Sequence, residues 1–246
     1  MNSIDGEKFV RMKEESKGEM VRGMFNDIAP TYDRLNHILS LDVDKLWRKR
    51  VVRIVGKLGA KRIMDMATGT GDLAIALARN IEGSTIYGAD FSSEMLAVAK
   101  QKIEQLGLTE RISLTECNAE NIPFEDGAVE AATVAFGVRN FEHQREALTE
   151  MKRTICSGGY LVVLEFSNPR CNFVRWCYRL YSHKILPAIG RLVSKHATAY
   201  TYLPDSIDKF ASPEAFTALL EEVGFDNVER RSLSMGIAHI YIAHKA

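Results

Sequence analysis

The stretch Asp65–Asp72, which reads DMATGTGD, constrains the fold of this 246-residue chain more than any other. It follows the short run RIM at 62–64 and precedes the helical pattern LAIALA at 73–78, so it predicts a strand, a glycine-rich turn and a helix start. Glycine permits positive φ and a close approach of a ligand, and the first N–H groups of the helix are free. The turn therefore predicts a ligand site, although a turn that only packs a strand on a helix is the plainer alternative.

The residues around the turn indicate the class of ligand. The motif GTGDLA at 69–74 satisfies the loose dinucleotide fingerprint, with Asp90 at a distance suited to a ribose. Acids at Asp65 and Asp72 flank the turn, and carboxylates suit a positively charged ligand better than a pyrophosphate. S-adenosylmethionine carries a sulfonium and an ammonium group and no phosphate. The sequence thus favours S-adenosyl-L-methionine as cofactor and leaves a NAD(P)-dependent oxidoreductase as the alternative.

Composition narrows the class of protein. The chain has 46% hydrophobic and 26% charged residues, which fits one globular domain, and its formal net charge of +0 lacks the basic excess of a nucleic-acid binder. No apolar run approaches the roughly 18 residues of a membrane span, and the N-terminus lacks the apolar core of a signal peptide. We therefore expect a cytoplasmic protein that at most contacts the inner face of a membrane. The cysteines form no CxxC pair, which predicts reduced thiols and no metal site or disulfide: Cys117, Cys156, Cys171 and Cys177.

Apolar runs and helical patterns alternate along the middle of the chain. This alternation predicts a parallel sheet with helices on both faces, and a closing antiparallel pair at the C-terminus. The expected strands are 63–67, 84–89, 112–117, 129–136, 160–166, 228–233 and 237–244, with a Ser157-Gly158-Gly159 turn before the fifth. The expected helices are about 7–24, 44–58, 71–81, the segment capped by Ser92, the segment ending near 155, and 213–223.

The alternating pattern breaks between Asn168 and Ser206, where apolar, aromatic and basic residues are mixed. This segment is either a packed helical insertion or a lid for an apolar substrate that touches a membrane surface. We expect one domain over 1–246. Its parts are an N-terminal helical extension (1–58), a cofactor-binding core (59–167), a lid or substrate insertion (168–206), and a C-terminal helix with antiparallel strands (207–246).

The carboxyl ends of parallel strands meet at one edge of a sheet, where ligands bind. Asp90 can accept hydrogen bonds from two ribose hydroxyls at this edge. Asn118 and the backbone N–H of Ala119 can read an adenine edge, while a plain turn residue is the alternative for Asn118. The segments that end there are 65–71, Asp90, 118–119 and 136–140.

Several motifs together resemble the menaquinone and ubiquinone biosynthesis C-methyltransferases over nearly the whole chain. The resemblance implies a class I methyltransferase Rossmann-like fold and methylation of a ring carbon of a polyprenylated quinol at the membrane surface. The motifs are Phe25-x-x-Ile28-Ala29-x-x-Tyr32-Asp33-x-x-Asn36, Leu46-Trp47-Arg48, 65–72, Asn118-Ala119-Glu120-x-x-Pro123-Phe124, Phe136-Gly137-x-Arg139-Asn140, Gly158-Gly159 and Leu164-Glu165-Phe166-Ser167-x-Pro169.

The resemblance implies that demethylmenaquinol is converted to menaquinol, with methylation of 2-polyprenyl-6-methoxy-1,4-benzoquinol in ubiquinone biosynthesis as the alternative. Ubiquinone-type members commonly have serine before Phe-Gly, where this chain has Ala135, which favours the menaquinone reaction. A non-catalytic S-adenosylmethionine-binding scaffold is a further alternative. The cofactor-binding residues expected from the turn, the strand ends and the family's contacts are Asp65, Gly69, Thr70, Gly71, Asp90, Asn118 and Ala119.

Arg139 and Asn140 are the predicted catalytic residues. A hydroquinone that loses a hydroxyl proton becomes a carbon nucleophile toward the sulfonium methyl. We expect Arg139 to stabilise the developing phenolate, because its pKa is too high for it to take the proton, and Asn140 to position a water that receives it. An arginine cap or salt bridge at a strand end is the structural alternative for Arg139.

Overall fold

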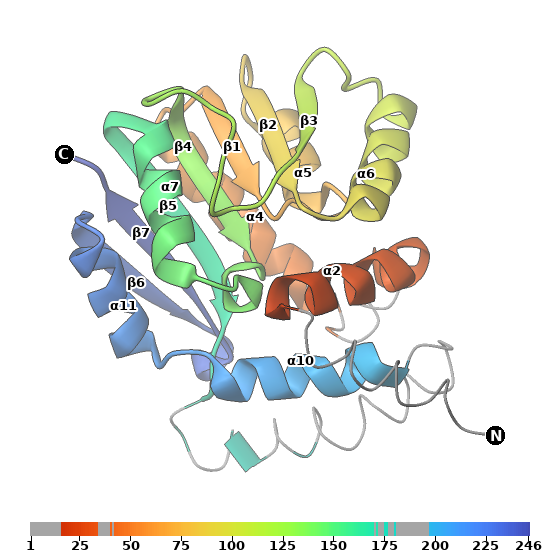
Figure 1. The fold of residues 1–246 in the computed structure, drawn as a ribbon. Coiled ribbons are helices and arrows are strands. Elements are labelled where there is room, and N and C mark those ends of the chain that lie inside the picture. Colours follow the sequence, from red (N-terminus) through yellow and green to blue (C-terminus); the bar gives the residue numbers. More distant parts are fainter. Residues whose placement is uncertain are drawn as a thin grey trace.

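A computed structural model describes residues 16–33, 40, 42–169, 171, 175, 176, 180 and 197–246 of the chain, with backbone alone at 197–201. Its centre is one seven-stranded sheet with the order β3-β2-β1-β4-β5-β7-β6 (Figure 1). Strands β1 to β5 are parallel, and β7 pairs antiparallel with both β5 and β6. The strands are β1 Arg62–Met66, β2 Thr85–Asp90, β3 Ile112–Glu116, β4 Val129–Ala135, β5 Ile155–Phe166, β6 Asp226–Leu233 and β7 Ala238–His244.

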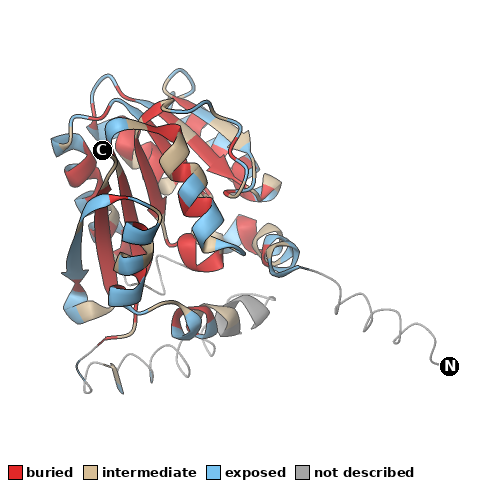
Figure 2. Ribbon diagram, turned by 60° about the vertical axis from the view of Figure 1, so that its left-hand side comes forward, coloured by how far each residue is buried: buried red, intermediate tan, exposed pale blue. Residues whose placement is uncertain are grey.

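Helices cover both faces of this sheet. Side chains from α4, α5 and α6 form an apolar cluster on one face, and side chains from α7 and α11 form a second cluster on the other. The inner strands between them are largely buried, whereas the edge strand β6 is mostly exposed (Figure 2). The mostly parallel sheet with helices on both faces and a closing antiparallel pair is therefore confirmed. The helices are α4 Val43–Lys57, α5 Asp72–Asn80, α6 Ser93–Gln105, α7 Gln144–Thr154 and α11 Pro213–Glu222.

Local sequence signals set the ends of these helices. Ser92 caps α6, because its Oγ accepts a hydrogen bond from the Met95 N–H at 3.2 Å. Ser212 caps α11 in the same way, through the Ala215 N–H, and Pro213 occupies the first helical turn. These caps place the start of α6 directly after Asp90, at the carboxyl end of β2.

Two further helices cross the carboxyl ends of the parallel strands. Helix α2 spans Lys17–Ile28 and leads into the short helix η1 at Ala29–Thr31, and α10 spans Ala197–Lys209 beside α2 (Figure 1). Of the helix expected at about 7–24, the part before residue 16 lies outside the described residues. Most of the expected lid at 168–206 also lies outside them, and α10 forms its described end.

The prediction of a turn at Ser157-Gly158-Gly159 was wrong, because β5 begins at Ile155 and continues through these residues. The pairing of β4 with β5 shifts register between Val129 and Ala131, which is a bulge. Gly158 has φ +78°, and a Cβ on Gly159 would lie 2.6 Å from the Glu130 carbonyl oxygen. The glycines therefore permit an irregular strand where the sequence pattern suggested a chain reversal.

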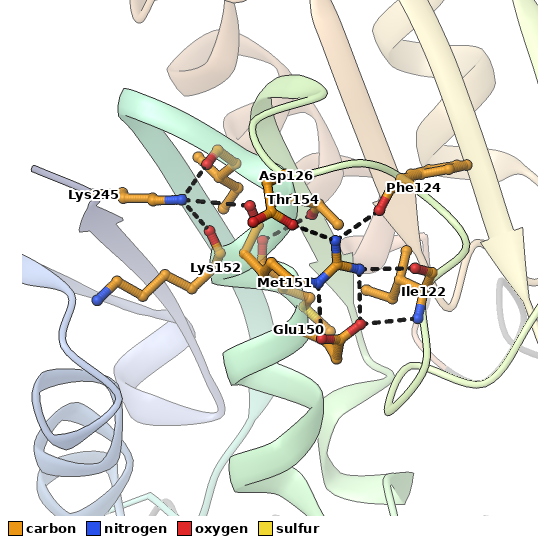
Figure 3. Close-up of polar contacts among 10 residues, drawn as sticks. Ile122, Phe124, Asp126, Glu150, Met151, Lys152, Thr154 and Lys245 are labelled. Carbon is orange, nitrogen blue, oxygen red and sulfur yellow. Dashed lines mark hydrogen bonds and ion pairs between the residues drawn. The ribbon is translucent and has the colours of Figure 1, made fainter.

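Arg153 of α7 fixes the long connection between β3 and β4 to this helix. Figure 3 shows its partners Ile122, Phe124 and Glu150. Its guanidinium donates to the carbonyl oxygens of Phe124 at 2.7 Å and Ile122 at 2.9 Å. The same group pairs with both oxygens of Glu150, which in turn accepts from the Ile122 N–H at 3.2 Å. This connection begins with residues that face the strand ends, so Arg153 holds one side of the region described below.

Replacing Arg153 with methionine should lower the free energy of unfolding by about 2 to 3 kcal/mol, because two partly buried carbonyls and Glu150 lose a charged donor. Arg145→Met is the matched control on the same helix, because the one partner that Arg145 has among the described residues is the exposed Glu222. This change should cost less than about 1 kcal/mol. Urea unfolding of the two variants measures the difference. Equal losses would show that the Arg153 contacts add nothing specific.

Candidate functional site

A pocket lies where the parallel strands end, between the sheet and α2. Gly18, Phe25 and Tyr32 close it from the side of α2 and η1. The other lining residues lie at the ends of β1, β2 and β4 or in the segments that follow β1, β2, β3 and β4: Met66, Ala67, Gly69, Asp90, Phe91, Met95, Cys117, Asn118, Ala119, Glu120, Ala135, Phe136, Gly137, Asn140, Phe141 and Glu142. Four strand ends thus converge on one pocket, as the sequence predicted.

The glycine-rich turn has the backbone geometry that its sequence requires. Gly69 has φ +56° and lines the pocket, and no atom lies within 4 Å of the position of a Cβ there. Gly71 has φ +81°, and a Cβ on it would lie 3.2 Å from the Ala99 Cβ. Gly69 therefore leaves space for a ligand, whereas Gly71 lets α5 approach α6 closely and is not a lining residue.

Asp90 joins this turn to the end of β2. Its Oδ2 accepts from the Gly69 N–H at 2.8 Å, and its Oδ1 accepts from the Ser92 N–H at 2.9 Å. Burial raises the pKa of Asp90 to about 6, against the lowering effect of these backbone hydrogen bonds. Each oxygen keeps a second lone pair for a hydroxyl donor, and Asp90 lines the pocket.

Asp65 lies behind the turn and is not among the lining residues. It is 1% exposed and accepts from the hydroxyls of Thr68 and Thr133, each at 2.7 Å. Burial raises its pKa to about 6 as well. The observed contacts give Asp65 a supporting position, in which it ties the turn to β4.

Thr70 points away from the pocket into a chain of charged groups. Its hydroxyl donates to Asp33, which follows the lining residue Tyr32, and Lys102 bridges Asp33 at 2.7 Å and Asp72 at 2.5 Å. Arg48 lies 3.8 Å from Asp72 on the other side. Thr70 is therefore placed to hold the N-terminal segment against the turn, and its direct contact with a cofactor stays a prediction.

Asn118 and Ala119 both line the pocket. The Asn118 Oδ1 accepts from the Glu120 N–H at 3.1 Å, so the side chain also shapes the turn, which was the alternative for this residue. Ala119 is 5% exposed and contributes backbone and methyl surface. The adenine contact of this pair stays a prediction.

Asn140 and Arg139 follow β4 in the short helix η2 (Val138–Asn140), but only Asn140 lines the pocket. The Asn140 Oδ1 accepts from the Tyr202 hydroxyl at 3.1 Å, which connects the pocket to α10. Burial raises the pKa of Tyr202, so this hydroxyl stays protonated and acts as a donor. Tyr202 carried no sequence signal as a site residue.

The Arg139 guanidinium is buried behind the pocket. It pairs with Glu165 at 2.8 Å, donates to the Phe136 carbonyl, and reaches the Ser206 hydroxyl at 3.2 Å. Glu165 also accepts from the Arg139 N–H at 3.2 Å. The structure thus gives Arg139 the buried salt bridge that was its structural alternative, and its catalytic role stays a prediction.

The sequence placed Phe136 in the segment 136–140 at the strand ends, but no apolar side chain was assigned to the wall of the pocket. Phe91 and Met95 follow Asp90, while Phe25 comes from α2, and Phe136 and Phe141 flank the segment around Asn140. The phenylalanine rings offer flat surfaces for planar rings of a ligand. Their positions beside Asp90 and Asn140 in the sequence were the available signal, but no pattern separates such residues from ordinary core residues.

The charged side chains that the structure describes in the lining of the pocket all have the same sign. Among the described residues that line it, the charged ones are the acids Asp90, Glu120 and Glu142, without a lysine or arginine. Within the same described part of the chain, no group of three His, Cys, Asp or Glu residues could hold a metal ion, and no helix has the length and apolar character to cross a membrane. The pocket therefore suits a cationic ligand better than a phosphate-bearing one.

Replacing Glu165 with leucine should lower the free energy of unfolding by about 3 to 5 kcal/mol, because it leaves the Arg139 charge buried without its partner. The double variant Arg139→Met/Glu165→Leu should cost less than the sum of the single changes. Chemical unfolding of the three variants gives the coupling energy. Additive losses would contradict a buried pair that acts as one unit.

Comparison with other proteins identifies the family. The ubiE/COQ5 methyltransferase family matches residues 12–245. The ubiquinone/menaquinone biosynthesis C-methyltransferase UbiE of Geobacter sp. (strain M21) is 43% identical over 230 residues, which cover 93% of this chain and 97% of that protein. The demethylmenaquinone methyltransferase of Thermus thermophilus is 44% identical over 222 residues, which cover 90% of this chain and 100% of that protein.

Solved structures show the same fold at lower identity. A putative S-adenosylmethionine-dependent methyltransferase from Methanococcus maripaludis has a TM-score of 0.64 at 21% identity and covers 90% of this chain and 93% of its own. The [4+2]-cyclase SpnF has a TM-score of 0.69 at 16% identity and covers 94% and 97%. These likenesses support the class I methyltransferase fold alone. The match over residues 12–245 decides the family, and this chain belongs to the ubiE/COQ5 methyltransferases.

Proposed function

We propose that this chain is an S-adenosylmethionine-dependent C-methyltransferase that converts demethylmenaquinol to menaquinol in menaquinone biosynthesis. One observation carries the proposal: a pocket at four strand ends combines the acceptor Asp90 with acidic and aromatic lining, in a member of the ubiE/COQ5 methyltransferase family. The demethylmenaquinone methyltransferase of Bacteroides fragilis (strain YCH46) is 39% identical over 229 residues. Family membership also disfavours the NAD(P)-dependent oxidoreductase.

The residues of the pocket fit S-adenosylmethionine. The open position beside Gly69 accepts a ligand next to the turn, and the free lone pairs of Asp90 accept the ribose hydroxyls. Asn118 and Ala119 border the space on the β3 side, where they would meet the adenine. The bound cofactor supplies a methyl group on a positively charged sulfur. The acidic lining favours that charge and would repel a pyrophosphate.

Asn140 is the polar residue placed to act on the quinol ring. The Asn140 Oδ1 accepts from the Tyr202 hydroxyl, and one amide N–H makes a long contact of 3.5 Å to the Phe136 carbonyl oxygen. The second N–H is the donor that can face a substrate oxygen. An amide donor stabilises negative charge as it develops on a ring oxygen during loss of the hydroxyl proton. Asn140 therefore binds and orients the ring oxygen, and it can also hold a water that receives the proton.

Arg139 acts in this proposal as a positioning residue. Its side chain binds the Phe136 carbonyl at the start of the segment that carries Asn140 and pairs with Glu165 on β5, so it ties that segment to the sheet. Its charge is compensated by Glu165, which weakens its direct effect on a phenolate. Arg139 contributes to catalysis mainly by holding Asn140 against the pocket.

The choice between the two quinol classes depends on a small pocket residue. Ala135 lines the pocket at the end of β4 and offers no hydroxyl. A ring without a methoxy oxygen makes no use of a donor there, so Ala135 supports demethylmenaquinol over the 2-polyprenyl-6-methoxy-1,4-benzoquinol of the ubiquinone reaction. The UbiE relative is named for both ubiquinone and menaquinone biosynthesis, so the ubiquinone precursor is the alternative substrate.

The substrate class supports a location in the cytoplasm with contact at the inner face of the membrane. A polyprenyl tail stays in the bilayer, so the enzyme must reach the ring at the membrane surface. Two described residues of the 168–206 insertion expose large apolar side chains: Trp176 is 62% exposed and Leu180 is 39% exposed. These side chains support a lid at that surface.

The direct test supplies purified protein with reduced demethylmenaquinone and with S-adenosylmethionine labelled in its methyl group. The label should appear on a ring carbon, and the oxidised quinone should give no product because it is a poor carbon nucleophile. Cofactor binding without labelled product would support the non-catalytic scaffold. Binding of NAD without methyl transfer would support the oxidoreductase.

The affinity for S-adenosylmethionine should fall in acid because Asp90 is the acceptor. The pKa of Asp90 in the free protein is about 6, and hydroxyl donors bind the ionised form, so binding lowers that pKa. Affinity should be constant above about pH 7 and weaken by up to about tenfold per pH unit below about pH 6. Calorimetric titration measures it. Asp90→Asn should bind weakly without this inflection, and a persistent inflection would exclude Asp90 as its source.

Replacing Asn140 with leucine should lower kcat by about 100-fold or more, because the developing oxyanion loses its donor. Tyr202→Phe removes only the bond that orients the amide and should lower kcat by about 2- to 10-fold with KM little changed. Steady-state kinetics with the reduced quinol separates the effects. Normal turnover of the Asn140 variant would remove this residue from the mechanism.

A further inference from the structure

A basic surface lies on α4, outside the pocket. One side of α4 packs Val51 and Val55 into the apolar cluster against the sheet. The opposite side exposes a stripe with the spacing i, i+3, i+4, i+7 and i+11, which falls on one face of a helix. We call it the α4 basic face, and its residues are Leu46, Lys49, Arg50, Arg53 and Lys57.

The four cations of the α4 basic face are not compensated. In the described part of the chain, none of them has an ion pair or a side-chain hydrogen bond, whereas their neighbours Lys45 and Arg48 pair with Asp42 and Asp44. The chain has 32 basic and 32 acidic residues, so this concentration of charge is local. Four like charges on three helical turns repel one another, so contacts within the fold do not account for the stripe as a whole. The four cations are therefore available to an anionic partner.

Exposed apolar side chains accompany these charges. Leu46 begins the stripe and is 59% exposed, and Met235 is 73% exposed on the turn Ser234–Gly236. That turn is held against α4, because the Trp47 Nε1–H donates to the Ser234 Oγ at 3.1 Å. Cations together with exposed leucine and methionine suit the headgroup region of a bilayer better than a nucleic acid or an acidic protein.

The N-terminal part of α4 also lies close to the pocket, through two residues that neighbour the α4 basic face. The Arg48 guanidinium carbon lies 5.6 Å from the centroid of the Phe136 ring, and the Trp47 ring lies 6.1 Å from it. Phe136 lines the pocket. Contact between α4 and a membrane would thus bring the pocket near the surface from which a polyprenylated ring is presented. This step depends on the proposed function.

We propose that the α4 basic face docks the protein on a bilayer that contains anionic phospholipids. A lysine or arginine near such a surface strengthens partitioning by roughly fivefold, and the attraction acts over about one Debye length. Four cations therefore give salt-sensitive, reversible binding, with Leu46 and Met235 in contact with the headgroups. The insertion at 168–206 and this face are separate elements, so they can be tested separately.

The test measures co-sedimentation of the full-length protein with vesicles. Vesicles of phosphatidylcholine with phosphatidylglycerol should retain the wild-type protein, vesicles of phosphatidylcholine alone should not, and salt should weaken the binding. Lys49→Gln/Arg53→Gln should weaken binding by roughly 30-fold. The matched control Lys100→Gln/Arg145→Gln removes two exposed cations from α6 and α7 and should change binding less than about twofold.

Any one of the following results would overturn the proposal. The wild-type protein does not bind anionic vesicles, the α4 variant binds them as tightly as wild type, or the control variant loses as much affinity for them as the α4 variant does. Displacement of the vesicles by single-stranded RNA at equal charge would also overturn it in favour of nucleic acid. Methylation of a quinol without a prenyl tail is the independent readout, and both variants should keep it. Vesicle binding without any methylation would refute the proposed function and leave the docking surface standing.

Discussion

The structure depends on one buried carboxylate that binds two backbone amides from different loops. Asp90 accepts from Gly69 in the turn after β1 and from Ser92 before α6, so it fixes both strand ends. Its burial raises its pKa to about 6, which corresponds to a cost of roughly 3 kcal/mol for the ionised form at neutral pH. Because the folded-state pKa is the higher one, stability is lost as pH rises from about 4 to 6. In return for this loss of stability, the Asp90 carboxylate is held in one position as a hydrogen-bond acceptor in the pocket.

Segments that are distant in the sequence complete the site. Helix α2 spans the strand ends through polar contacts: Lys17 donates to the Phe141 carbonyl at 2.8 Å, and Arg22 pairs with Glu116 at 2.7 Å. Helix α10 contributes Tyr202 and Ser206, which bind Asn140 and Arg139. The core of the sheet therefore supplies the cofactor side of the pocket, and the two added helices complete the side that we assign to the quinol.

The sequence predicted those parts of the structure that follow from local pattern. The strand-turn-helix at 65–72 and the cap at Ser92 depend on neighbouring residues, and both formed as expected. The role of Gly158 and Gly159 depends on β4 and on Lys245 near the C-terminus, so the sequence pattern suggested a turn where there is a bulge. A local sequence pattern contains no information about a contact with residues so distant in the chain.

The candidate site shows the same division. The sequence predicted five of the residues that line the pocket, because the ends of parallel strands can be located from sequence patterns. These residues are Gly69, Asp90, Asn118, Ala119 and Asn140. The directions of the remaining predicted side chains depend on tertiary partners: Glu165 turns Arg139 behind the pocket, and Asp33 turns Thr70 away from it. Tyr202 was not identified because only folding brings α10 to Asn140.

A crystal structure with bound S-adenosylmethionine tests the central claim most directly, because it shows which groups the pocket residues bind. We expect the ribose hydroxyls to donate hydrogen bonds to the Asp90 carboxylate and the adenine to lie beside Asn118 and Ala119. We also expect an open space between the methyl group and Asn140 that is wide enough for a bicyclic ring. A donor bound away from Asp90, or a donor whose methyl group faces a closed wall, would contradict it.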